Sequence, residues 1–198
     1  FEISGSYISK SDVAILDLLA NNNWERPIYL DLSVVHTTSL KIDKYLQNEG
    51  FAYRFIPVKN QGPKARVDSD LLYDNMMNKF VWGNLGDKRI FIDNNLKRTV
   101  EVVQIKNNFY ELADQLLSEN KKEKALTVLD RLYKIVPLEM YGTSYYDILT
   151  ASSYYMASSN EKGDQLMKSL ADDCFSRIEF YLSLGSSYVD YYEDDVKR

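Results

Sequence analysis

The 198-residue sequence is poor in the residue types on which most catalytic and metal centres depend. It has one cysteine, Cys174, and one histidine, His36, so it cannot form an internal disulfide or a cysteine-rich metal site. A serine or cysteine triad would have to use His36, and the sequence has no GxSxG motif. We therefore expect no catalytic residue, metal or cofactor in this chain, with His36 in a loop and Cys174 in the core.

Long apolar runs and concentrated positive charge are also missing. The longest apolar stretch, Val13 to Ala20, is interrupted by Asp17 and is far shorter than the roughly 20 residues of a membrane-spanning helix. The net charge is −5, and the lysines and arginines form no cluster. We expect no nucleic-acid partner, because binding to a phosphate backbone needs a basic surface.

What the sequence does have is the composition of a globular protein, with 45% hydrophobic and 27% charged residues. Its first half mixes helix and strand signals. Ser9 and Asp12 resemble a capping box ahead of an apolar segment, which predicts a buried helix over 11–21. Ser69 begins a second predicted helix, which extends to Phe80.

Three short segments have the alternation or apolar content of strands. Residues 28–32 alternate apolar and polar side chains, and residues 52–58 do so up to Pro57, which marks an edge or an end. Residues 89–93 contain the apolar run Ile90 to Ile92. The stretch 60–67 is basic and contains a Gly-Pro pair, so it predicts a surface loop.

From residue 94 onward the apolar residues recur with helical spacing. One predicted face holds Phe109, Leu112, Ala113 and Leu116, and the next holds Ala125, Leu129, Leu132 and Val136. The short connection at Asn120 predicts an antiparallel hairpin, and its small residues fit the tetratricopeptide pattern. A second hairpin is predicted from 145–158 and 161–184, followed by a frayed or disordered tail over 185–198.

The sequence thus predicts an α+β protein. A small three-stranded α/β part, residues 1–94, is expected to pack on an all-helical, tetratricopeptide-like array, residues 95–198. Ten side chains are expected in the core: Leu16, Leu19, Ile28, Leu30, Phe55, Ile92, Leu112, Leu116, Leu129 and Leu132.

Two regions are candidate ligand or interface sites. A helix-to-strand junction combines Trp24, Arg26 and Tyr29, and its Trp and Arg either touch a ligand or stack on each other. Sixteen residues are tyrosine, and five of them gather near the second hairpin: Tyr141, Tyr145, Tyr146, Tyr154 and Tyr155. Tyrosines can stack on sugar rings or extended peptides, and they can equally serve hairpin packing. Asp31 and Asp93 follow predicted strands, where α/β folds often place ligands.

The string Asn22 to Tyr29 (NNWERPIY), the segment Leu46 to Val58, and the repeat-like helices resemble the soluble C-terminal region of a multi-pass membrane family. Trp82 to Asn84 and the pair Ile92 and Asp93 extend this resemblance. The family is common in Bacteroidetes and is similar to protein O-mannosyltransferases of the GT-C type. The resemblance implies that the chain, which begins at Phe1 rather than Met, is a fragment at the periplasmic face of the inner membrane.

The resemblance also implies a function. The parent protein would transfer a sugar from a polyprenyl-phosphate carrier to an acceptor hydroxyl, with its catalytic residues in the membrane-embedded half of the same polypeptide. This chain would be non-catalytic and would position an acceptor protein or glycan, or stabilise the membrane half. Two alternatives stay open: a tetratricopeptide-like scaffold that binds a partner segment, and a small α/β enzyme that uses Asp31 and Asp93.

Overall fold

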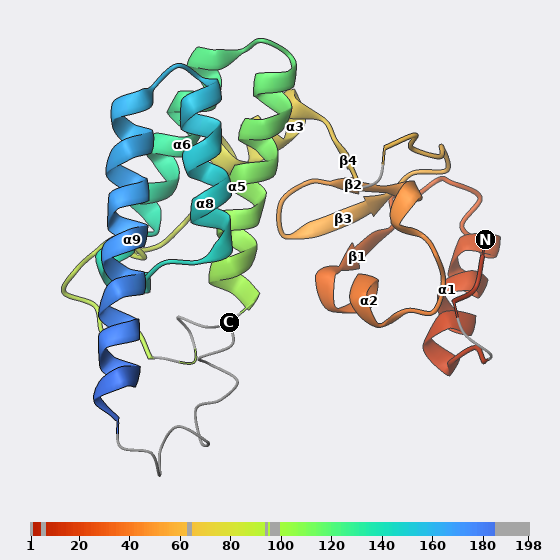
Figure 1. The fold of residues 1–198 in the computed structure, drawn as a ribbon. Coiled ribbons are helices and arrows are strands. Elements are labelled where there is room, and N and C mark those ends of the chain that lie inside the picture. Colours follow the sequence, from red (N-terminus) through yellow and green to blue (C-terminus); the bar gives the residue numbers. More distant parts are fainter. Residues whose placement is uncertain (1, 5–6, 63–64, 94, 96–99, 185–198) are drawn as a thin grey trace. The chain divides into compact units, whose positions relative to one another are not determined.

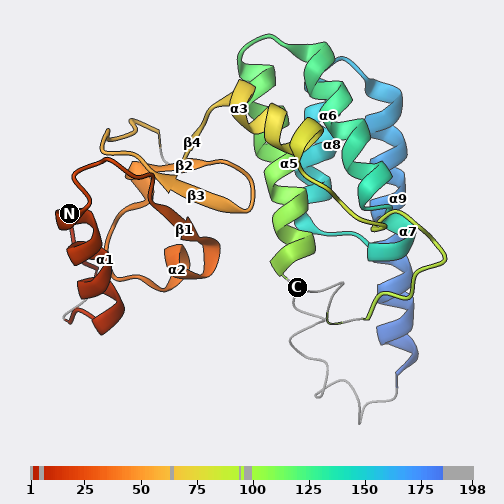
Figure 2. The ribbon, with the colours of Figure 1, turned by 180° about the vertical axis from the view of Figure 1, so that it is seen from behind.

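The computed structural model describes residues 2–4, 7–62, 65–93, 95 and 100–184. Over these ranges the protein has an α+β fold, with a small mixed sheet toward the N-terminus and a helical array toward the C-terminus, as the sequence predicts. The chain divides into two compact units, Phe1–Val81 and Trp82–Arg198, which Figures 1 and 2 show from opposite sides. The predicted tail, residues 185–198, lies outside the described ranges.

Helix α1 (Lys10–Asn21) begins at the predicted capping box. The Ser9 hydroxyl accepts from the Asp12 amide at 3.1 Å, and the Asp12 carboxylate accepts from the Ser9 amide at 2.9 Å. The expected full burial of this helix is wrong. Leu19 is buried, but Val13 and Leu18 are 56% and 50% exposed, because only one side of the helix faces the small N-terminal core.

The sheet of the first unit has four strands rather than the expected three. Its order is β1-β3-β2-β4, with β1 spanning Tyr29–Asp31, β2 Leu46–Asn48, β3 Ala52–Phe55 and β4 Arg66–Val67. β3 pairs antiparallel with β1 and β2, whereas β4 runs parallel to β2. The strands predicted at 28–32 and 52–58 are therefore confirmed as β1 and β3, and part of the predicted loop at 60–67 is β4.

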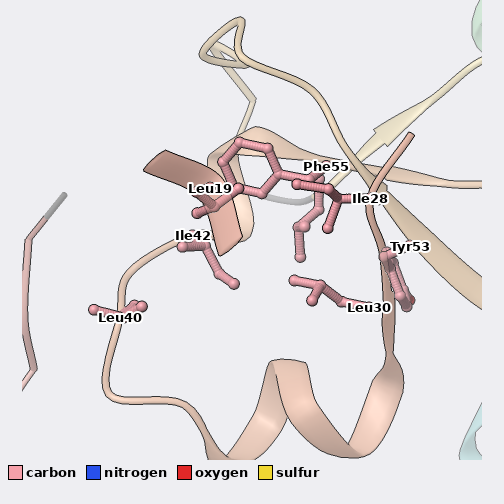
Figure 3. Close-up of a cluster of buried hydrophobic side chains, with 8 residues drawn as sticks. Leu19, Ile28, Leu30, Leu40, Ile42, Tyr53 and Phe55 are labelled. Carbon is pink, nitrogen blue, oxygen red and sulfur yellow. The ribbon is translucent and has the colours of Figure 1, made fainter. Parts of the chain in front are cut away.

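Eight side chains form the core of this unit. Figure 3 shows side chains from α1, β1 and β3 pointing toward one another beside the segment that follows α2 (Leu32–Thr37). The eight are Leu19, Ile28, Leu30, Leu40, Ile42, Leu46, Tyr53 and Phe55. His36 lies within α2, not in a loop as expected. A 3₁₀ turn, η1 (Asp43–Tyr45), leads into β2.

The helix predicted at the end of this unit is present in two parts. α3 (Ser69–Asp74) continues directly into a π-helical turn, η2 (Asn75–Lys79). Leu72 and Met76, one turn apart, are fully buried, which agrees with the predicted spacing.

The second unit consists of two helical hairpins, both as predicted. The first pairs α5 (Val100–Ser118) with α6 (Lys122–Ile135), and the second pairs α8 (Tyr145–Met156) with α9 (Asn160–Ser183). α5 also packs against α8, and the short helix α7 (Leu138–Tyr141) connects the hairpins (Figures 1 and 2). The apolar faces predicted for the first hairpin are fully buried: Phe109, Leu112, Ala113, Leu116, Ala125, Leu129, Leu132 and Val136.

Residues 82–93 belong to the helical unit, so the boundary lies earlier than the expected residue 94. The Trp82 ring lies 5.4 Å from that of Phe109, and the Tyr141 hydroxyl donates to the Leu85 carbonyl at 2.8 Å. A Cβ at Gly86 would overlap the carbonyl of Lys134. These contacts fix the segment against α5, α6 and α7.

The strand expected at 89–93 does not form. Ile92 is buried, but Phe91 is 89% exposed, and no strand of the described residues pairs with this segment. Cys174 is also placed differently, since it is exposed on α9 rather than buried. Of the ten core residues expected, nine are buried, and Leu16 is partly buried against the N-terminal core.

Candidate functional site

The first unit contains a hollow of about 360 Å³ beside the turn that follows α1. A volume of this size is at the lower end of the range of small-molecule sites, about 300–1,000 Å³. Its walls come from the turn between α1 and β1 and from strands β2 and β3, which are distant in sequence. The side chains that give it chemical character are Trp24, Glu25, Arg26, Gln47, Arg54 and Phe55.

The turn has a backbone conformation that is unusual for its residues. Asn23 and Trp24 adopt left-handed φ angles of 50° and 60°. Such a conformation costs roughly 1–2 kcal/mol for an L-residue, less for asparagine, and is concentrated at functional sites. The Asn22 side-chain amide donates to the Arg26 carbonyl at 2.8 Å and closes the turn. The turn thereby presents Trp24 and Arg26 at the hollow.

Trp24 stacks on the sheet rather than on Arg26. Its ring centroid lies 5.8 Å from that of Phe55 with the planes 20° apart, and Tyr45 stacks on Phe55 in turn at 5.9 Å. Trp24 nevertheless stays 50% exposed, so the indole face that does not contact Phe55 is open to solvent. Offset stacking of this kind orients an aromatic ring without covering it completely.

A row of polar side chains crosses the sheet next to the turn. Tyr29, Arg54 and Gln47 are cross-strand neighbours on β1, β3 and β2. All three reach the carboxylate of Glu49, which is 9% exposed. The Tyr29 hydroxyl donates to it at 2.9 Å, the Gln47 amide at 3.0 Å, and an Arg54 nitrogen lies 3.7 Å away.

This arrangement determines what each group can do. The hydrogen bond to Glu49 raises the pKa of Tyr29, so Tyr29 stays protonated at neutral pH and acts as a donor rather than a base. The side chain of Arg26 is exposed and has no hydrogen-bond or ion-pair partner in the part of the chain that the structure describes. The hollow thus combines a free guanidinium, a second guanidinium oriented by Glu49, and an aromatic face.

The two aspartates considered for catalysis are placed apart. Asp31 caps α2 by accepting from the Ser33 amide at 2.8 Å and from its hydroxyl, which lowers the pKa of Asp31. Asp93 accepts from the Asn95 amide at 2.6 Å and follows no strand. Asp31 belongs to the first unit and Asp93 to the second. Neither lines the hollow.

Three of the five candidate tyrosines serve packing in the second unit. Tyr141 is buried, and its hydroxyl donates to the Leu85 carbonyl. Tyr154 is also buried, and its hydroxyl donates to the Asp130 carboxylate. The Tyr155 hydroxyl donates to the Asp164 carboxylate. Burial raises the pKa of Tyr141 and, together with Asp130, that of Tyr154.

Tyr145 and Tyr146 form a separate pair, edge to face with centroids 6.1 Å apart. Tyr145 is 68% exposed. Tyr146 is partly buried, and this burial, with a smaller contribution from the negative charge of Glu111, raises the pKa of Tyr146. Tyr145 is the most exposed of the α8 tyrosines, since Tyr155 is 39% exposed and has its hydroxyl bound to Asp164.

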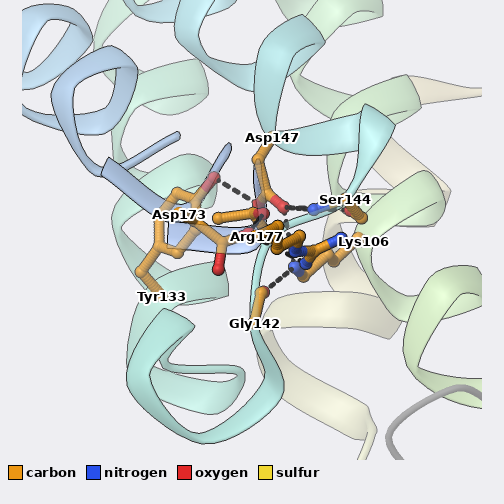
Figure 4. A network of polar contacts seen from close by, with 8 residues as sticks. Lys106, Tyr133, Gly142, Ser144, Asp147, Asp173 and Arg177 are labelled. Atoms are coloured by element: carbon orange, nitrogen blue, oxygen red, sulfur yellow. Dashed lines mark hydrogen bonds and ion pairs between the residues drawn. The ribbon is translucent and has the colours of Figure 1, made fainter. Parts of the chain in front are cut away.

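The second unit also contains a buried ion pair. Figure 4 shows the Lys106 ammonium between the Asp147 carboxylate, 2.8 Å away, and the Gly142 carbonyl, 3.0 Å away. Tyr133 donates to the same carboxylate at 2.9 Å, and the Ser144 amide does so at 2.6 Å. The side chains of the ion pair are 3% and 0% exposed. Every group has partners and none is open to a ligand, so the network joins α5, α6 and α8 structurally.

Two side chains of the hollow, and the Glu49 carboxylate that lies behind them, were not candidates from the sequence. Trp24 and Arg26 were, but Gln47, Glu49 and Arg54 were not. The alternation of Tyr53 and Phe55 indicates that Arg54 lies on the opposite face of its strand, which is a usable signal. Gln47 and Glu49 gave no such signal, because β2 spans three residues and all three are buried. Within the described ranges, no three His, Cys, Asp or Glu side chains are placed to hold a metal ion.

Comparison with known families finds a similarity over the N-terminal part of the chain. The family model described as TMEM260-associated domain 2 matches residues 1–71, and all the residues that line the hollow lie in this range. The matched residues are about a third of the chain, and the match to a TMEM260-associated domain indicates a link to a glycosyltransferase-like membrane protein. No curated protein and no solved structure matches the chain. In the described part of the chain, no helix combines the length and the hydropathy needed to cross a bilayer.

Proposed function

We propose that this chain is a non-catalytic, extramembrane part of a glycosyltransferase and that it positions the acceptor or stabilises the membrane-embedded half of the same polypeptide. The observation that carries the proposal is the match of residues 1–71 to TMEM260-associated domain 2. The hollow lies entirely within the matched residues, so its side chains belong to the domain that is associated with TMEM260.

The finer features of the proposal follow the family resemblance. The parent protein is a GT-C type enzyme that transfers a sugar from a polyprenyl-phosphate donor to a hydroxyl, and the chain faces the periplasm at the inner membrane. The acceptor is a protein or a glycan. The chemistry of the hollow supports acceptor binding, because Trp24, Arg26 and Arg54 offer stacking and hydrogen bonds without a nucleophile held by a base.

The test uses the full-length membrane protein with the double substitution Trp24→Ala and Arg26→Ala. We expect the KM for the acceptor to rise about tenfold or more, while kcat at saturating acceptor and the KM for the sugar donor stay unchanged. The control is Lys10→Ala with Val13→Ala, two exposed residues of α1 outside the hollow.

Two results would overturn the proposal. The first is sugar transfer or glycoside hydrolysis by the purified 198-residue chain, because the proposal assigns the chemistry to the membrane half. The second is an unchanged acceptor KM in the double variant, together with an unchanged amount of assembled full-length enzyme when the whole chain is deleted.

A second candidate function is a tetratricopeptide-like scaffold that binds a protein segment. It is favoured by the stacking of the two hairpins through α5 and α8 and by the exposed Tyr145 beside Tyr146 and Glu111. Under this function the chain alone, without the membrane half, forms a stoichiometric complex that Tyr145→Ala abolishes. Tyr155→Ala is the control, since its hydroxyl is already bound to Asp164. A complex that survives Tyr145→Ala would contradict the assignment of this surface.

A further inference from the structure

The hollow provides an aromatic surface of the kind that packs against the C–H face of a sugar ring. Phe55 covers one side of the Trp24 indole, and half of the Trp24 surface remains exposed. An indole held by stacking keeps its orientation when a ligand arrives, so little conformational freedom is lost on binding. The backbone of Trp24 is also held in place, because the hydrogen bond from the Asn22 side chain to the Arg26 carbonyl closes the turn around it.

Around this surface the hollow provides planar hydrogen-bonding groups. Arg26 and Arg54 present guanidinium nitrogens, Gln47 a carboxamide, and Glu25 a carboxylate. A guanidinium or a carboxylate has two parallel positions and can bind two adjacent hydroxyl groups at once. Saccharides present adjacent hydroxyls next to an apolar C–H face, which fits a hollow that has both kinds of surface.

The charges of the hollow are nearly balanced. Arg26 and Arg54 are positive, but Glu25 lines the same hollow, and Arg54 lies 3.7 Å from the Glu49 carboxylate. A phosphate or a carboxylate ligand would therefore meet the Glu25 carboxylate as well as the two guanidinium groups, and the charge of Arg54 is already partly offset by Glu49 behind it, which reduces the attraction for an anion. The balance favours a ligand that is polar and uncharged.

We propose that the hollow is a binding site for a short neutral saccharide, which stacks on Trp24 and donates and accepts hydrogen bonds with Arg26, Glu25 and Arg54. Gln47 and Tyr29 hold Glu49, which in turn orients Arg54. This saccharide site would give the acceptor of the proposed function a chemical class. The biological role of the site rests on the proposed function, but saccharide binding itself does not. Binding is tested on the chain alone, so the two can fail separately.

The test uses the purified 198-residue chain labelled with fluorotryptophan. The chain has two tryptophans, Trp24 at the hollow and Trp82 on Phe109, so fluorine NMR gives one probe at the site and one internal control. The probes are methyl α-mannoside, methyl β-glucoside, maltose and inorganic phosphate. We expect at least one saccharide to shift the Trp24 resonance saturably, with a Kd on the order of millimolar, and to leave that of Trp82 unchanged.

Variants separate a saccharide site from an anion site. Arg26→Ala should weaken saccharide binding about tenfold, because a hydrogen bond to a charged group is lost. Arg66→Ala is the matched control: Arg66 is an exposed arginine on β4 of the same sheet and does not line the hollow. For a neutral ligand it should have no effect, and raising the salt concentration should have none either.

Three outcomes would overturn the proposal. The first is the absence of a saturable Trp24 shift with every saccharide. The second is binding of phosphate alone, weakened by Arg66→Ala and by salt, which would identify an anion site. The third is a saccharide shift that Arg26→Ala leaves unchanged, which would place the ligand outside the hollow.

Discussion

The two units of this protein bury their side chains in different ways. The N-terminal unit has strands of two to four residues and a core of eight side chains, and polar groups line its hollow. The C-terminal unit has helices of up to 24 residues and encloses an ion pair whose side chains are almost completely buried. Long helices satisfy the hydrogen bonds of their own backbone and bury one face along their whole length. Short elements joined by turns leave more side chains available to a ligand. The comparison agrees with our proposal that the first unit binds a ligand, since the described side chains that line a hollow belong to that unit.

The tryptophans make this comparison measurable, because each unit has one. Trp24 reports on the N-terminal unit and Trp82 on the C-terminal unit. Fluorine NMR of the fluorotryptophan-labelled chain during urea denaturation therefore gives a separate free energy of unfolding for each unit.

The largest effect is expected from Lys106→Met in the C-terminal unit. The substitution leaves the Asp147 carboxylate buried without its cation, and breaking a buried pair in this way costs about 3–5 kcal/mol. The Trp82 unfolding curve should shift accordingly. Lys162→Met is the matched control: the Lys162–Asp130 pair is at the surface, with side chains 44% and 40% exposed, so its loss should cost at most about 1 kcal/mol. Equal losses in the two variants would show that the Lys106 pair contributes no more than a surface pair.

A smaller effect, confined to the N-terminal unit, is expected from Gly50→Ala. Gly50 lies between β2 and β3 with φ at +116°, and a Cβ there would overlap the ring of Phe80. Strain of this kind costs about 1–3 kcal/mol. The Trp24 curve should shift and the Trp82 curve should not. Gly62→Ala, where φ is not positive, should leave both curves nearly unchanged. A shift of the Trp82 curve by Gly50→Ala would mean that the units unfold together.

Tyr154→Phe should have an effect of about 1 kcal/mol on the C-terminal unit, the size of one net hydrogen bond. The Tyr154 hydroxyl donates to Asp130 at 3.1 Å, and Lys162 still pairs with Asp130 when the hydroxyl is removed. Tyr155→Phe changes a more exposed hydroxyl and should cost less. A larger loss for Tyr155→Phe would contradict the assignment of Tyr154 to packing.

The last prediction is a loss of stability of the N-terminal unit at acid pH, caused by protonation of Asp12. Hydrogen bonds from Thr38, Ser9 and Ser39 hold the pKa of Asp12 well below its ordinary value. The folded chain therefore keeps this carboxylate ionised where the unfolded chain takes up a proton. The stabilisation is complete above pH about 4, the ordinary pKa of aspartate, and is lost as the pH falls toward the folded value.

The Trp24 unfolding midpoint, measured at several pH values, should thus decrease below pH about 4. Asp12→Asn should remove most of this dependence. Asp43→Asn, at an exposed position of the same unit, should retain it. A pH profile that Asp12→Asn leaves unchanged would show that other carboxylates control the acid unfolding.

The elements that the sequence predicted correctly are those with strong local signals. The capping box of Ser9 and Asp12 and the helical spacing of Phe109, Leu112 and Leu116 depend on residues close together in the chain. β2 and β4 could not be predicted in this way. Each spans two or three residues, and β4 exists only because Arg66 and Val67 lie opposite Gln47 and Asn48.

The opposite error occurred at Ile90 to Ile92. These residues have strand composition, but no strand pairs with them, and Trp82 and Gly86 hold the segment against the helices instead. The prediction that Cys174 is buried failed in the same way, because it relied on apolar neighbours. The apolar residues Phe175 and Ile178 on this part of α9 are themselves exposed. Composition indicates what a segment can form, and tertiary contacts decide whether it does.

The sequence predicted one part of the candidate site and not the other. The unusual string around Trp24 and Arg26 identified one wall of the hollow. The other wall comes from Gln47 and Arg54, more than twenty residues away, and only the pairing of β3 with β1 and β2 brings them to that turn.

The small size of the sheet has a consequence for the behaviour of concentrated samples. The edge strands β1 and β4 have three and two residues, and the second presents the exposed Arg66. Edges this short expose few backbone groups to another molecule, and a charged side chain on an edge strand opposes strand addition. Fibril growth from these edges is therefore disfavoured.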